Sequence, residues 1–241
     1  SIERGTQAAG LARRRGGRAP VHSPSLALVS GKGGVGKSLL AANVALELAA
    51  LGAIERVLLV DGDAGLANAD LLLGWVPEAS LRDVLDGRVR PQEAVTRGAE
   101  GLDLLVSGRG PEVTQVLTRL ATGALGASGE TVFGRHGLTL FDLGAGIGDD
   151  VVHVAAACDR VWLVATPEPT SLADAYAMER RLLETRPDVR LELVVNRATD
   201  TEEGTRTHAA LDRMTRRFLG SPLSLRAVLP ADPAVLRAVA R

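Results

Sequence analysis

The sequence predicts an α/β fold, with a single doubly wound, mostly parallel sheet flanked by helices. Two features of its 241 residues lead to this prediction. From residue 25 onward, short apolar runs alternate with stretches of helical periodicity, the pattern of right-handed βαβ units. In addition, 46% of the residues are hydrophobic but only 2% are aromatic. Ala, Leu and Val must therefore fill the core, as they do where helices cover a buried parallel sheet.

The expected strands are the apolar runs at residues 26–29, 56–60, 102–106, 138–141, 161–165, 191–195 and 225–229. The expected helices span residues 37–51, 112–126, 148–158, 171–185 and 203–219. The first helix, for example, has Leu40, Val44 and Leu48 spaced by one helical turn, and Asp61 ends the second strand. Ligands of such sheets bind beyond the carboxyl ends of the strands, so the residues after each strand are the candidates for a site.

Charge and cysteine content exclude several classes of protein. The net charge of -1 argues against general electrostatic attraction to nucleic acid. The single cysteine, Cys158, excludes an internal disulfide and any site built from several cysteines, and it is typical of a reducing cytoplasm. No apolar run reaches the roughly 18 residues of a membrane span. We expect a cytoplasmic protein with a flexible basic arm at residues 1–22 and one domain at residues 23–241.

A phosphate-binding loop follows the first strand. Residues 31–38, GKGGVGKS, match G-x-x-x-x-G-K-[ST] between a strand and a helix, the context that this motif requires. Backbone N–H groups of Gly33, Gly34, Val35 and Gly36 are expected to surround a phosphate. Lys37 would reach the β- and γ-phosphates, and the Ser38 hydroxyl would bind Mg²⁺. A glycine-rich turn without a ligand is the alternative.

The distribution of lysine supports the phosphate site. Of the 28 lysines and arginines, only Lys32 and Lys37 are lysines, and both lie in this loop. All the other basic residues of this count are arginines. This indicates that positions 32 and 37 need a compact ammonium rather than a planar guanidinium.

With its second lysine at Lys32, the loop resembles the deviant Walker A motif of the MinD/ParA family of P-loop ATPases. The resemblance implies ATP or ADP and Mg²⁺ as cofactors, and slow hydrolysis of ATP to ADP and phosphate. It also implies an ATP-dependent homodimer in which Lys32 reaches the nucleotide of the partner subunit. Two polyphosphates brought face to face need extra positive charge, which such an exchange of lysines supplies. The alternative for Lys32 is a second contact to the nucleotide of its own subunit.

Carboxylates follow two of the strands. Asp61 and Asp63 come after the second strand, and Asp142 ends the run at 138–141. By resemblance, Asp63 is catalytic together with Lys32 and Lys37 and orients the attacking water. Asp61 and Asp142 join Ser38 near the metal, and the backbone of Gly144 approaches the γ-phosphate. Aspartates also end strands and cap helices for structural reasons, so the pattern alone leaves both readings open.

Residues after the last two strands are candidates for binding the base. Relatives read adenine with an asparagine where Asn196 stands, followed here by Arg197. An amide offers both a donor and an acceptor to one base edge. By the same resemblance, Pro230 and Asp232 close the other side of the base. A simple turn at the end of the strand is the alternative for Asn196.

Residues 63–74 and 166–176 resemble the flagellar branch of the family, the FlhG, FleN and YlxH type, which restricts flagellar number and placement. The branch implies the flagellar SRP-type GTPase as a partner, contacted here through residues 1–20. Relatives dock on the membrane through a C-terminal helix. We expect no such helix in the sequence up to Arg241, so that membrane binding would be possible only through that missing helix. Alternatives are a MinD-type septum-placement ATPase, a ParA-type partition ATPase that coats DNA, and an ATP-dependent metabolic enzyme.

Overall fold

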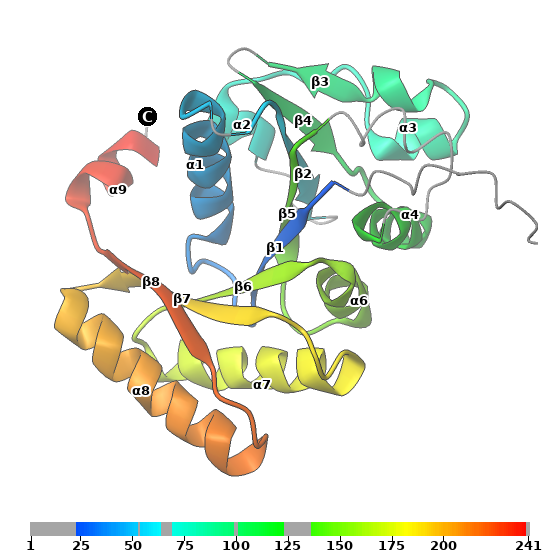
Figure 1. Ribbon diagram of the computed structural model, residues 1–241. Coiled ribbons are helices and arrows are strands. Elements are labelled where there is room, and N and C mark those ends of the chain that lie inside the picture. Colours follow the sequence, from blue (N-terminus) through cyan, green and yellow to red (C-terminus); the bar gives the residue numbers. More distant parts are fainter. Residues whose placement is uncertain (1–22, 53, 64–68, 99–100, 123–135, 240–241) are drawn as a thin grey trace, which may run out of the picture.

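A computed structural model describes residues 23–239 except 53, 64–68, 99–100 and 123–135. In these ranges eight strands form one sheet with the order β3-β4-β2-β5-β1-β6-β7-β8 (Figure 1). The strands are β1 Ser25–Ser30, β2 Val57–Gly62, β3 Val95–Arg97, β4 Leu102–Val106, β5 Leu138–Ala145, β6 Arg160–Ala165, β7 Leu191–Ala198 and β8 Ser224–Pro230. All neighbouring strands are parallel except β3 and β4, which are antiparallel.

Helices cover both faces of the sheet. They are α1 Lys37–Ala50, α2 Ala69–Leu73, α3 Leu81–Leu85, the 3-10 helix η1 Pro91–Glu93, α4 Pro111–Ala121, α6 Asp149–Ala157, α7 Pro169–Thr185, α8 Thr201–Phe218 and α9 Pro233–Val239. Figure 1 shows α1 on one side of the central strands and α6 on the other.

The strand alternation explains the two layers of the core. In β1, Leu26 and Leu28 pack beneath α1 and α2, whereas Ala27 and Val29 pack with α4, α6 and α7 on the opposite side. We call the side covered by α1 and α2 the α1 face. Each face is filled mainly by Ala, Leu and Val, as the composition predicts.

The predicted fold class is confirmed, and each expected strand is present. Strand β2 does not end at Asp61 but continues to Gly62, and β5 and β7 continue to Ala145 and Ala198. All three extend beyond the apolar runs that predicted them because they pair with neighbouring strands there. The predicted helix at 112–126 ends at Ala121, and residues 123–135 lie outside the described ranges. The sequence did not predict α2, α3, β3 or α9, because three to seven residues carry too little periodicity.

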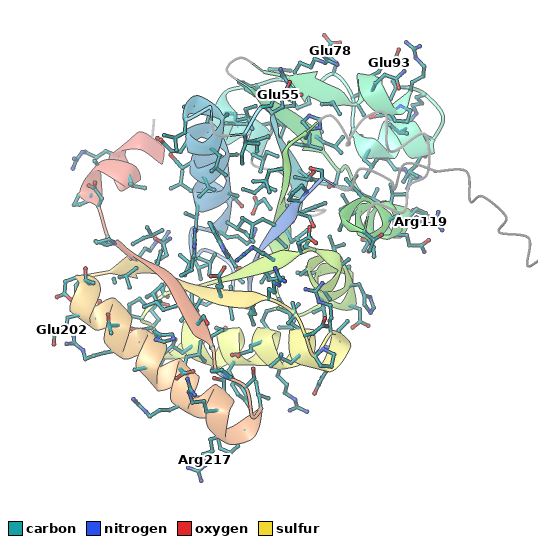
Figure 2. All side chains as sticks on the ribbon, in the orientation of Figure 1. Glu55, Glu78, Glu93, Arg119, Glu202 and Arg217 are labelled. Atoms are coloured by element: carbon teal, nitrogen blue, oxygen red, sulfur yellow. The ribbon has the colours of Figure 1, made fainter. Side chains whose placement is uncertain are left out.

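The long helix α8 is stabilised at both ends by side chains that match its dipole. Asp200 accepts a hydrogen bond from the backbone N–H of Glu203 at 2.7 Å and caps the helix. Glu202 stands in the first turn and Arg217 in the last, and Figure 2 shows both side chains projecting from the helix ends. These charges favour a helix whose exposed face is strongly polar.

No helix in the described part of the chain is long and apolar enough to cross a membrane. The expected arm at residues 1–22 lies outside the described residues, so its boundary with the domain stays a prediction.

Candidate functional site

The loop at residues 31–36 joins β1 to α1 and is shaped by its glycines. Gly34 and Gly36 have φ of 77° and 87°, in the left-handed region that favours glycine. A Cβ placed on Gly31 would lie 2.1 Å from the backbone oxygen of Asp174 in α7. The loop therefore packs directly on α7, and only glycine fits at position 31.

Four polar residues at the carboxyl ends of neighbouring strands share the α1 face. They are Asp61, Asp142, Thr166 and Asn196, each two positions after a core residue beneath α1 (Leu59, Leu140, Val164 and Val194). Asp61 and Asp142 lie directly opposite each other in the pairing of β2 with β5. The sheet thus brings the predicted carboxylates to one edge, beneath the first turn of α1.

Lys37, the first residue of α1, pairs with this edge. Its Nζ donates a hydrogen bond to Oδ1 of Asp142 at 2.5 Å, and both side chains are buried. The ammonium of the predicted phosphate-binding lysine and the carboxylate of the predicted metal ligand therefore neutralise each other. Ser38, half-buried, follows in the same helix turn.

Asp61 anchors the chain after β2. Its Oδ1 accepts the N–H of Asp63 at 3.2 Å and its Oδ2 accepts the N–H of Ala69 at 2.9 Å. Residues 64–68, between these two contacts, lie outside the described ranges. The fully buried carboxylate thus holds both ends of the segment that carries Asp63. No local sequence pattern indicated this role of Asp61.

Asp63 and Gly144 are brought together. A Cβ placed on Gly144 would lie 3.7 Å from Oδ1 of Asp63, so the carboxylate is beside the backbone of β5. The end of β5 also touches the loop, since the Cβ of Ala145 lies 3.9 Å from the Cβ position of Gly33. The N–H of Gly146 donates to the carbonyl of Ser30 at 2.9 Å, which ties β5 to β1 at the entrance of the loop.

Lys32 points toward α7. Its Nζ donates to Oε2 of Glu168 at 2.9 Å and to the hydroxyl of Thr170 at 3.0 Å. The hydrogen bond and charge of Lys32 lower the pKa of Glu168. Sequence reasoning did not identify these two partners, although both lie in the 166–176 stretch that pointed to the flagellar branch.

Asn196, in β7, contacts the loop at residues 31–36. Its Nδ2 donates to the carbonyl of Val35 at 2.8 Å, and its Oδ1 accepts the N–H of Arg197 at 3.0 Å. Arg197 has φ of 58°, the one non-glycine residue with positive φ among those described. Each polar atom of the amide therefore has a partner within the protein, and the amide also carries a second N–H and a second oxygen lone pair that could contact a base.

Pro230 and Asp232 lie at the carboxyl end of the neighbouring strand. Pro230 is paired with Ala198 of β7, and the N–H of Ala231 donates to the carbonyl of Ala198 at 2.7 Å. Oδ1 of Asp232 accepts the N–H of Ala234 at 2.7 Å at the start of α9. The structure thus places both residues beside β7, with the Asp232 carboxylate engaged by the helix.

The donor set fits a magnesium ion that is shared with a phosphate. In the described ranges, no three His, Cys, Asp or Glu side chains form a group that could hold a metal. Mg²⁺ is usually bound by one or two carboxylates and by substrate phosphates rather than by a complete protein cage. Asp61 and Asp142, opposite each other across β2 and β5, could provide such carboxylates, and Ser38 follows Lys37 in the first turn of α1.

Comparison with known proteins agrees with this geometry. Residues 26–241 match the model of the CobQ/CobB/MinD/ParA nucleotide binding domain. The chain is 36% identical to the antiactivator FleN of Pseudomonas aeruginosa over 89% of its own length and 76% of that protein. It is 31% identical to the flagellum site-determining protein YlxH of Helicobacter pylori, over 81% of the chain and 65% of that protein.

Among solved structures, the septum site-determining protein MinD of Pyrococcus horikoshii, complexed with Mg-ADP, is similar with a TM-score of 0.69. Its sequence identity is 24%, and the match covers 89% of this chain and 84% of that chain. At 24% sequence identity, this structural similarity shows a shared fold only.

Proposed function

We propose that this chain, which belongs to the CobQ/CobB/MinD/ParA nucleotide-binding family, is an ATP-hydrolysing dimerisation switch that controls flagellar number and placement. The observation that carries the proposal is the loop at residues 31–38, whose Lys37 meets Asp142 at the carboxyl edge of the sheet. The identity to FleN over most of the chain supports the flagellar role over the other roles of the family.

The loop would hold the phosphates of ATP. Backbone N–H groups of Gly33, Gly34, Val35 and Gly36 line a turn that opens a helix, where the helix dipole favours negative charge. Lys37 would turn from Asp142 toward the β- and γ-phosphates, because a phosphate offers the ammonium a second anion at the same place. Ser38, Asp142 and Asp61 would hold Mg²⁺, which supplies positive charge to the phosphate oxygens.

Asp63 would orient the attacking water. Its carboxylate stands beside Gly144, at the carboxyl edge where the γ-phosphate is expected. Asp61 supports it by holding the N–H groups of Asp63 and Ala69. We therefore assign Asp61 a positioning role in addition to its proposed role near the metal.

Lys32 would serve a second subunit. It contacts Glu168 and Thr170 at the start of α7, whereas Lys37 contacts Asp142, so the two ammonium groups have separate partners within the chain. Two chains that face each other across their loops could exchange these lysines and so stabilise two polyphosphates. ATP would then favour the homodimer, and hydrolysis would release it.

The base would lie at the ends of β7 and β8. Asn196 and Arg197 adjoin Val35 and Gly36 at the end of the loop, and Pro230 and Asp232 follow on the next strand. Outside the described part, residues 1–20 would contact the flagellar SRP-type GTPase. The switch would act in the cytoplasm, and at the inner face of the membrane only through a C-terminal helix of the kind that relatives carry.

Deleting the gene in its own host and counting flagella per cell by electron microscopy tests this function. We expect extra or misplaced flagella with normally placed septa, and no rescue by a Lys37→Ala copy. Unchanged flagella would exclude the flagellar role. Misplaced septa or lost plasmids would instead indicate the septum or partition role of the same family.

A further inference from the structure

Glu168 forms an ion pair with Lys32 and is also acted on by the charge of Arg197. Lys32, in the phosphate loop, contacts its carboxylate at 2.9 Å. The charge of Arg197, from the proposed base site, also acts on Glu168 and contributes to its lowered pKa after the hydrogen bond and charge of Lys32. Arg197 is close to the loop as well, since its Nε lies 4.0 Å from the Cβ position of Gly36.

The backbone around Lys32 is fixed relative to α7. Gly31 packs on the backbone of Asp174 so closely that no Cβ fits between them. Glu168 precedes the first residue of α7, and Thr170 is the second residue of the helix. The Lys32 ammonium therefore meets both acceptors without rearrangement of either segment.

We propose that Glu168 is a positioning residue that holds Lys32 against α7 in the single subunit, so that ATP-driven dimerisation must break the Lys32–Glu168 contact. This inference rests on the proposed exchange of lysines between subunits. When Lys32 leaves, Arg197 remains near Glu168 and partly compensates its charge. Glu168 would thus raise the ATP concentration at which the dimer forms.

The size of the effect follows from the exposure of the pair. The Lys32 and Glu168 side chains are 39% and 61% exposed, and such pairs contribute about 0.2–1 kcal/mol. In a symmetric dimer each of the two subunits breaks one Lys32–Glu168 pair. The dimer dissociation constant therefore changes by the square of the factor that corresponds to the free energy of one pair. Losing the charge of Glu168 is therefore expected to tighten the dimer about 2- to 30-fold.

Glu168→Gln tests this, because it keeps the shape of the side chain and removes its charge. The dimer dissociation constant of the whole chain is measured by analytical ultracentrifugation with Mg²⁺ and adenylyl imidodiphosphate. Glu184→Gln is the matched control, since Glu184 forms an exposed ion pair with Arg180 on the same helix, far from the loop. We expect a tighter dimer for Glu168→Gln alone, with the difference shrinking between about 50 mM and about 500 mM salt.

A second measurement examines the contact without dimerisation. Because Lys32 and Lys37 are the two lysines of the chain, acetylation followed by mass spectrometry reports on each separately. Lys37 is buried against Asp142 and serves as the internal reference. Glu168→Gln should speed the labelling of Lys32 relative to Lys37, and Glu184→Gln should not. Thr170→Val, which removes the other acceptor, should act in the same direction and covers the case that Glu168→Gln folds poorly.

The outcomes separate this inference from the proposed function. If the unaltered chain stays monomeric with the ATP analogue, the dimerisation switch itself is wrong. If it dimerises but Glu168→Gln dimerises equally or more weakly at low salt, the switch stands and the role of Glu168 is overturned. Unchanged labelling of Lys32 in Glu168→Gln would also contradict it.

Discussion

Lys37 and Asp142, which are 105 residues apart in the chain, form a buried ion pair of 2.5 Å at the mouth of the phosphate loop. Each residue comes from a different sequence motif, and each compensates the charge of the other. Without this pair, either charge would be buried alone at the end of the sheet.

Lys37→Ala should destabilise the nucleotide-free protein as well as abolish nucleotide binding. It leaves Asp142 buried without its cation, and breaking such a pair costs about 3–5 kcal/mol. Urea denaturation measures this loss. Lys37→Ala combined with Asp142→Asn should recover most of the stability but no binding. Equal stability of the single and double variants would show that the pair does not hold the site.

Asp63→Ala should slow ATP hydrolysis about 10²- to 10⁴-fold while nucleotide binding persists, because a group that positions water acts on the chemical step. Single-turnover phosphate release and the binding of a fluorescent ADP separate the two effects. Asp70→Asn is the matched control, since the carboxylate of this nearby aspartate accepts only the N–H of Leu71 in the hydrogen bonds described. Hydrolysis at the normal rate in Asp63→Ala would remove Asp63 from the catalytic residues.

Gly31→Ala should lower thermal stability far more than Gly33→Ala. A Cβ at Gly31 would lie 2.1 Å from a backbone oxygen of α7, and one at Gly33 would meet its nearest atom at 3.9 Å. Neither position requires a positive φ, so the difference reports the packing of the loop on α7. Calorimetry of the two variants side by side makes the comparison. Similar melting temperatures would mean that the loop does not rest on α7.

Glu179 should make the protein less stable as the pH rises. Burial, followed by the charge of Asp212, raises the pKa of this α7 carboxyl to about 8. The folded state then binds the proton more tightly than the unfolded state, so stability falls between about pH 4.5 and about pH 8.

Glu179→Gln should remove this dependence, which urea denaturation across that range measures. Glu184→Gln, on the exposed side of the same helix, should leave it in place. A Glu179→Gln protein with the original pH profile would show that another group is responsible.

Much of the fold could be predicted because its signals are local. Each apolar run that was predicted as a strand became one, and the GKGGVGKS loop lies between β1 and α1 as its motif requires. The shortest elements could not be predicted, because segments such as β3, three residues long, depend on the neighbour they pair with.

The sequence by itself determined the chemical groups of the site and the strand ends at which they stand. Alternation along a strand sets which of its own residues share a face, whereas the pairing of the strands was needed to show that Asp61, Asp142 and Asn196 lie on the same face. The tertiary structure alone decided which of these groups meet. Strand β5 lies between β1 and β2, which sets Asp142 opposite Asp61 and under Lys37, and α7 packs on Gly31, which brings Glu168 to Lys32. Strand order and helix packing depend on contacts across more than a hundred residues, which no local pattern encodes.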